Sequence, residues 1–154
     1  MRSTDYSFGS TAAIVTSTAL IAGLGAASAS RATVVSGLLV VALADNLTDS
    51  ISIHLYQEAE DLDRQRAFRS TLVNFAARLV VALTFVALVV LLPSAAARAA
   101  AMAWGMSLLV VLTVLLSRER GLRLAPEIAK HIAAAAATVA ASHLIGSLIQ
   151  EQVR

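Results

Sequence analysis

Five long apolar stretches, separated by short polar segments, constrain the fold of this chain more than any other feature. They cover about residues 8–27, 33–56, 71–92, 95–116 and 128–149. A helix needs about 20 largely apolar residues to cross the hydrocarbon of a bilayer, and each stretch reaches or approaches that length. Because the connections are short, consecutive helices should be antiparallel neighbours. The sequence therefore predicts an all-α membrane protein, with five transmembrane helices in one bundle and a single domain over residues 1–154.

The composition agrees with a chain that is surrounded by lipid. Of its 154 residues, 58% are hydrophobic and 14% are charged, whereas soluble domains are usually about 45–50% apolar and about 25% charged. The absence of cysteine excludes disulfides and thiolate chemistry. A net charge of +2 gives no electrostatic footprint for nucleic acid. The sequence also lacks a nucleophile elbow, a phosphate loop, a zinc-protease motif and a haem motif. We therefore expect neither an enzyme nor a nucleic-acid-binding protein, and no resident cofactor.

The basic residues predict how the chain is oriented in the membrane, because cytoplasmic loops are enriched in Lys and Arg. Eight basic residues share the side of the N-terminus and three share the other side, while Arg78 lies inside a helix. The eight are Arg2, Arg64, Arg66, Arg69, Arg118, Arg120, Arg123 and Lys130, and the three are Arg31, Arg98 and Arg154. We expect an inner-membrane protein with a cytoplasmic N-terminus and an external C-terminus.

The first stretch has an alternative interpretation as a cleaved signal peptide, since GAASAS at residues 25–30 is similar to a signal-peptidase site. We favour a retained helix for two reasons. Arg2 is offset by Asp5, and the apolar run is long for a signal peptide.

The second stretch carries most of the ionisable groups that fall within the membrane, where such groups are costly and usually functional. At 100° per residue, one helical stripe holds Asp45, Asp49, Ser52, Tyr56 and Glu60, with Thr48 beside it. Asn46 and Ser50 flank this stripe, and His54 and Glu58 lie four residues apart on nearly the opposite face. We expect the stripe to line a bundle interior, a dimer interface or a water-filled cavity.

Oxygen ligands of this kind suit divalent cations, and imidazole shifts the preference toward iron, manganese or zinc. The candidate ligands within the membrane are Asp45 and Asp49, with Asn46 and Thr48 as neutral oxygen donors. His54, Glu58 and Glu60 are candidates at the cytoplasmic entrance. Two simpler interpretations remain open. Asp49 can neutralise Arg78, since each lies seven residues, about 10 Å, from the cytoplasmic end of its stretch, and His54 with Glu58 can be the hydrated end of a helix. Asp45 has no partner that the sequence identifies.

Three segments resemble the vacuolar iron transporter family of iron and manganese exporters. FGSTAAIVTSTALIAGL at 8–24 is similar to the family's first helix, and SGLLVVALADNLTDSISIHLYQEAE at 36–60 to its second helix. IAAAAATVAASHLIGSLI at 132–149 is similar to its closing helix. The resemblance implies five helices and a homodimer. It also implies a pathway between the two first helices that carries iron(II) or manganese(II) out of the cytoplasm against protons.

The chain departs from the family pattern at its acidic positions. The Asp-Gly step of the family's first helix falls on Ala12 and Ala13. The Ser-Met step of its second helix falls on Thr48-Asp49, and the Gly-Glu-Tyr step falls on residues 52–54, which places Ile53 at the glutamate. We therefore expect a dimeric exporter of a divalent transition metal, with a non-transporting membrane scaffold as the alternative. A transporter of organic cations is a third possibility, because it would use the same carboxylates.

Overall fold

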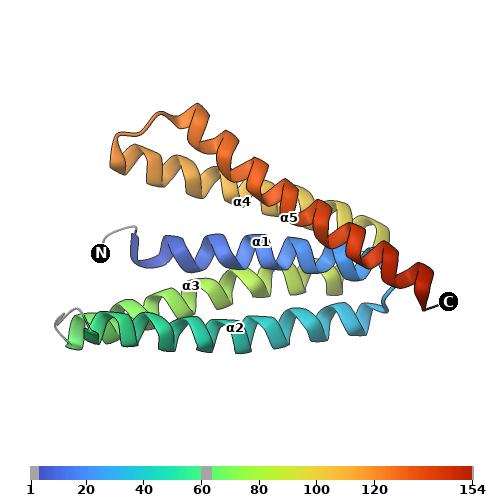
Figure 1. The fold of residues 1–154 in the computed structure, drawn as a ribbon, viewed down its shortest axis with the longest axis horizontal. Coiled ribbons are helices and arrows are strands. Elements are labelled where there is room, and N and C mark those ends of the chain that lie inside the picture. The colour runs from blue at the N-terminus through green and yellow to red at the C-terminus, as the bar shows by residue number, and fades with distance from the viewer. Residues whose placement is uncertain (1–3, 60–63, 154) are drawn as a thin grey trace.

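The computed structural model describes residues 4–59 and 64–153, and within these ranges the side chains of residues 4–8, 53–54, 57–59 and 64–67 fall outside the description. The described chain forms five α-helices: α1 (Thr4–Ala26), α2 (Arg31–Ala59), α3 (Arg64–Leu91), α4 (Ser94–Arg120) and α5 (Leu124–Gln152). Consecutive helices run in opposite directions, so the N- and C-terminal ends lie at opposite ends of the bundle (Figure 1). Each helix is long and apolar enough to cross a membrane. This is the architecture of a multi-pass membrane protein.

The helices extend beyond the apolar stretches that predict them, because helical hydrogen bonding continues into polar residues at the membrane surface. The largest extension is in α3, which begins at Arg64 rather than near residue 71. Gly121 ends α4 in the left-handed conformation (φ 64°), as a helix-ending glycine does. Pro126 does not break the chain before α5 but lies within its first turn. Proline is tolerated there because the amides of the first turn have no acceptor within the helix.

Helix α1 lies at the centre of the bundle and contacts each of the other four helices. The α2–α3 hairpin packs on one side of it and the α4–α5 hairpin on the other (Figure 1). Half of its membrane-spanning segment is buried, more than in any other helix. Its residues are mostly small or hydroxylated, and small residues let helices approach closely in lipid, where packing drives association. The composition of α1 therefore explains its central position.

Helices α1 and α5 approach each other closely near the external end that the charge distribution predicts. A Cβ atom on Gly146 would overlap the main-chain carbonyl oxygen of Gly23, and one on Gly23 would lie 3.0 Å from the carbonyl oxygen of Ser142. The absence of side chains at these two glycines therefore permits the close helix contact. From this contact α5 diverges, so that the α4–α5 turn stands away from the N-terminal end of α1 (Figure 1).

The remaining apolar side chains divide between a core and a lipid-facing exterior. Ile21, Leu38, Phe85 and Leu109 are among the most buried, and they come from α1, α2, α3 and α4. Large apolar side chains on the outside of the bundle include Leu91, which is 78% exposed. Such an exterior is stable only in hydrocarbon, which agrees with five membrane-spanning helices.

Candidate functional site

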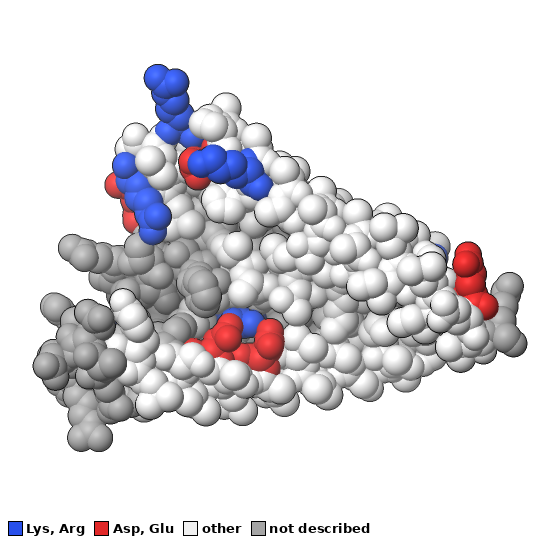
Figure 2. All heavy atoms as spheres, in the orientation of Figure 1, with Lys and Arg blue, Asp and Glu red and all other residues white. Residues whose placement is uncertain are grey.

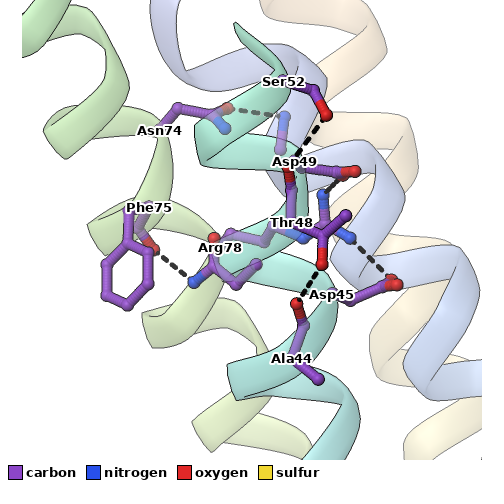
Figure 3. A network of polar contacts seen from close by, with 10 residues as sticks. Ala44, Asp45, Thr48, Asp49, Ser52, Asn74, Phe75 and Arg78 are labelled. Carbon is purple, nitrogen blue, oxygen red and sulfur yellow. Dashed lines mark hydrogen bonds and ion pairs between the residues drawn. The ribbon is translucent and has the colours of Figure 1, made fainter. Parts of the chain in front are cut away.

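A buried arginine with two carboxylate partners forms the most concentrated charge in the described interior of the membrane-spanning segments. The Arg78 guanidinium of α3 donates through Nη2 to Asp45 of α2 at 2.9 Å and through Nη1 to Asp49 of α2 (Figure 3). Asp45 and Asp49 lie one helical turn apart, so one planar guanidinium reaches both. We call Asp45, Asp49 and Arg78 the acid–arginine cluster.

The cluster confirms one prediction and corrects another. The Asp49–Arg78 pair is present, as the equal depth of the two residues in their helices predicts. The expectation that Asp45 has no partner is wrong, because Arg78 also pairs with Asp45. The error has a physical reason: one guanidinium carries five N–H donors in a fixed fork and can serve two acceptors. A one-to-one search for partners therefore leaves one carboxylate unassigned.

The three side chains of the cluster differ sharply in exposure. The Arg78 side chain is 5% exposed, whereas that of Asp49 is 35% and that of Asp45 is 51% exposed. The guanidinium thus lies inside the bundle, covered by its acidic partners, and the Asp45 carboxylate lies at the surface. Figure 2 shows the two carboxylates as an acidic patch over α2, with a small basic area beside it. The surface between this patch and the C-terminal end is uncharged.

The cluster lies within the hydrophobic part of both helices. The apolar segment of α2 runs from Arg31 to Ser52, and that of α3 from Phe68 to Leu91. Asp45 precedes Ser52 by seven residues, about 10 Å of helix, and Arg78 follows Phe68 by ten residues, about 15 Å. The exposed carboxylate of Asp45 is therefore at membrane depth, where charged groups normally face a protein interior or water.

A second polar layer packs α1, α2 and α3 together beside the cluster. Asn74 lies one turn before Arg78 on the same face of α3, and its side-chain carbonyl accepts a hydrogen bond from the main-chain N–H of Gly9 at 2.9 Å. A Cβ atom on Gly9 would overlap this Asn74 oxygen, so the glycine permits the approach. On α2, Asn46 is fully buried and donates to the carbonyl oxygen of Phe75 at 2.9 Å (Figure 3).

Three buried polar atoms of this layer have no hydrogen-bond partner among the residues that the structure describes. They are the Oδ1 atom of Asn46, the Oγ atom of Ser50 and the Nδ2 atom of Asn74. Asn46 and Ser50 are one turn apart on α2, the helix that packs against the Asn74 face of α3. An unsatisfied buried polar group costs about 1–3 kcal/mol. Water is the usual partner of such groups inside proteins.

The remaining predicted ligands are only partly brought together. Asn46 points to α3 rather than to the exposed side of Asp45 and Asp49. Thr48 is exposed on α2 and donates to the carbonyl oxygen of Ala44 at 2.9 Å, which leaves its oxygen lone pairs available. The side chains of His54 and Glu58, and the whole of Glu60, lie outside the described residues. Within the described part of the chain, no group of three or more His, Cys, Asp or Glu side chains could hold a metal ion.

Asn74 and Gly9 are the polar partners that the sequence interpretation missed. A signal existed for Asn74, because Asn74 and Arg78 are four residues apart and therefore lie on one face of a helix. The contact with Gly9 joins positions 65 residues apart. No local pattern in the sequence predicts that contact.

Comparison with protein-family models, with curated proteins and with solved structures finds no match for this chain. The resemblance to the vacuolar iron transporter family therefore stays a prediction from the sequence.

Proposed function

We propose that this chain is one subunit of a homodimeric membrane transporter that exports a divalent transition-metal cation, iron(II) or manganese(II), from the cytoplasm. The observation that carries the proposal is the carboxylate of Asp45, which is 51% exposed at membrane depth while its cationic partner is buried. A charged side chain at the centre of a membrane helix costs at least about 2.5–3.5 kcal/mol on insertion scales. Contact of this carboxylate with lipid is therefore unfavourable, and an aqueous pathway or a second subunit is the favourable environment.

The charges of the acid–arginine cluster support a cation as the cargo. Two carboxylates and one guanidinium leave a formal charge of −1 in each chain, and two chains facing each other would carry −2. This charge matches one divalent cation. Carboxylate oxygens from two subunits would also supply more oxygen ligands than one chain offers, as hard and borderline cations require.

The two aspartates differ in exposure, and we assign them different roles. Asp49, the less exposed, would keep the Arg78 charge compensated throughout the cycle. Asp45, the more exposed, would exchange Arg78 for the cargo, with Thr48 as a neutral ligand nearby. In the absence of cargo, Arg78 pairs with both carboxylates and compensates one of their two negative charges. Protonation of Asp45 would compete with the cation in the same way, which would couple transport to a proton gradient.

Flux into proteoliposomes tests the proposal. The full-length protein is reconstituted, manganese(II) is added outside, and a metal-quenched dye reports entry. We expect uptake above that of protein-free liposomes, with inhibition by excess iron(II) and none by excess tetraethylammonium. Uptake that tetraethylammonium blocks as well as iron(II) does would favour a transporter of organic cations. A folded dimer that passes none of these cations would contradict transport.

The second candidate function is a non-transporting membrane scaffold. One observation favours it: Arg78 bonds to both aspartates, so the cluster can be complete within one chain as a stabilising element. The same flux experiment separates the two functions, because a scaffold gives folded protein without cation entry.

A further inference from the structure

A cavity of about 160 Å³ lies at the opposite end of the bundle from the α4–α5 turn. It sits where α1 ends and α2 begins, and where α3 ends and α4 begins, which is the end that the charge distribution predicts to be external. Arg31 and Arg98 line it together with the hydroxyl-bearing Ser28 and Ser94, and its remaining lining residues are apolar or small. None of the described residues that line this cavity carries a carboxylate. We call it the arginine cavity.

The two arginines are held in place by the ends of neighbouring helices. Arg31 donates to the main-chain carbonyl oxygens of Val90 at 3.3 Å and Leu92 at 3.0 Å, at the end of α3. Arg98 donates to the carbonyl oxygen of Gly25 at 3.1 Å, at the end of α1. A Cβ atom on Gly25 would lie 2.8 Å from Cδ of Arg98, so the absence of a side chain at Gly25 leaves room for the Arg98 side chain. Cations at helix C-termini are favourable, and these contacts fix both guanidinium groups beside the cavity.

The helix ends use only part of the hydrogen-bonding capacity of the two arginines. A guanidinium has five N–H donors, and the contacts above use two on Arg31 and one on Arg98. Among the described residues, no ion pair involves Arg31 or Arg98, so neither is neutralised by a carboxylate there. Two guanidinium groups, each with unused N–H donors, therefore border the cavity. Its volume of about 160 Å³ has room for a small polyatomic group, since one water takes about 30 Å³ in the liquid.

The start of α4 adds to the positive potential at the same place. Pro93 precedes the helix and no side chain caps it. The first amide with a main-chain partner is that of Ala97, which donates to the Pro93 carbonyl at 2.7 Å. The first turn, from which Ser94 and Arg98 line the cavity, therefore presents amides without intrahelical acceptors. This terminus strengthens a site that the cavity and its two arginines already define.

We propose that the arginine cavity binds a phosphate group, either the phosphodiester of an anionic lipid headgroup or a free phosphate ion. The guanidinium fork matches the oxygens of phosphate and binds them in pairs. Basic pockets between membrane helices bind anionic lipid headgroups on the cytoplasmic or matrix side of membranes, and the same pairing of guanidinium with phosphate applies in the other headgroup layer. The apolar lining, which includes Ile21, Val34 and Val89, would contact the glycerol and upper acyl region of a lipid. The proposal does not depend on cation transport.

Lipid retention and phosphate binding test the site. The full-length protein is reconstituted with equal amounts of phosphatidylglycerol and phosphatidylcholine and purified in detergent, and the bound lipid is counted by native mass spectrometry. We expect retained phosphatidylglycerol to exceed phosphatidylcholine by about tenfold or more. Phosphate added to delipidated protein, with chloride as the reference anion, shows whether the free ion also binds.

Variants locate the binding. The double variant Arg31→Gln/Arg98→Gln should lose the preference for phosphatidylglycerol, whereas Arg98→Lys should keep most of it because the charge remains. The matched control is Arg118→Gln/Arg123→Gln, which removes two exposed arginines from the other end of the bundle. Binding of phosphatidylglycerol alone assigns the site to a lipid headgroup, and binding of phosphate as well assigns it to the anion.

Two results would overturn the proposal. The first is wild-type protein that retains neither phosphatidylglycerol over phosphatidylcholine nor phosphate over chloride. The wild-type comparison decides this even if the double variant does not fold. The second is a folded double variant with an unchanged preference, because the binding would then lie elsewhere on the molecule.

Discussion

Arg78 has two acidic partners of unequal exposure, so the loss of either one leaves its charge partly compensated. We expect Asp45→Asn to change the free energy of unfolding by about 0–1 kcal/mol, since the Asp45 side chain is half exposed and Asp49 still pairs with Arg78. Asp49→Asn should cost more because that carboxylate is less exposed. The double variant should cost about 3–5 kcal/mol, because it leaves a buried charge with no counter-ion. Thermal and denaturant unfolding in detergent measure these values. If the loss in the double variant equals the sum of the two single losses, the two aspartates do not share Arg78 as a partner.

Asn74 of α3 and Ser50 of α2 are both buried and polar, but we expect substitutions at them to differ in cost. Asn74→Leu removes the acceptor for the Gly9 amide, which is buried, so the expected loss is about 1–3 kcal/mol. Ser50→Ala removes a hydroxyl that has no partner in the structure and should change stability by less than about 0.5 kcal/mol. The same unfolding measurements compare the two variants. A larger loss from Ser50→Ala would mean that a bound water completes the hydrogen bonding of that layer.

The sequence predicts the candidate site only in part, and its residues show why. Asp45 and Asp49 stand out because carboxylates in an apolar helix are rare, and the equal depth of Asp49 and Arg78 in their helices predicts that pair. The second bond of Arg78 and the Gly9 contact of Asn74 depend on the rotation of α3 against α2 and α1. Packing of the whole bundle sets that rotation, and no pattern within one helix contains it.

Among the helices, the contact between α1 and α5 is the one most sensitive to side-chain size. Gly146→Ala places a Cβ atom against the main chain of Gly23, and backbone cannot yield as a flexible side chain does. We expect a loss of about 1–3 kcal/mol, as for overpacked cores. Ala141→Leu is the matched control, since Ala141 is exposed on the same helix and should tolerate a lipid-facing side chain. Equal stability of the two variants and the wild type would mean that α5 packs elsewhere.

The existence and order of the helices follow from the sequence, whereas their ends and neighbours follow less well. Five apolar stretches predict the five helices. The start of α3 at Arg64 is missed because apolar content marks the membrane-spanning part and not the whole helix. The central position of α1 agrees with its small residues, but these residues alone do not specify which helices surround it.

At the scale of the whole molecule, the exposed polar residues of α2 predict where a second copy packs. The chain has no cysteine, so any disulfide cross-link in a single-cysteine variant must involve the introduced residue. Thr48→Cys, on the exposed face beside Asp45, should form disulfide-linked dimers in native membranes under mild oxidation. Ala141→Cys, which is also exposed but on α5, should remain monomeric under the same conditions. The reverse pattern would place the dimer interface on α5 and leave Asp45 outside it.

The most direct test of cation transport is manganese(II) flux through Asp45→Asn, normalised to the amount of folded protein in the liposomes. Ser52→Ala is the matched control: Ser52 is exposed on the same helix, and among the described residues its hydroxyl bonds to the main-chain carbonyl of Thr48 alone, at 2.9 Å. The proposed mechanism predicts that Asp45→Asn folds normally and has a flux at least tenfold below that of the wild type, while Ser52→Ala has wild-type flux. Wild-type flux through folded Asp45→Asn would contradict the role of Asp45 as the cation-binding residue.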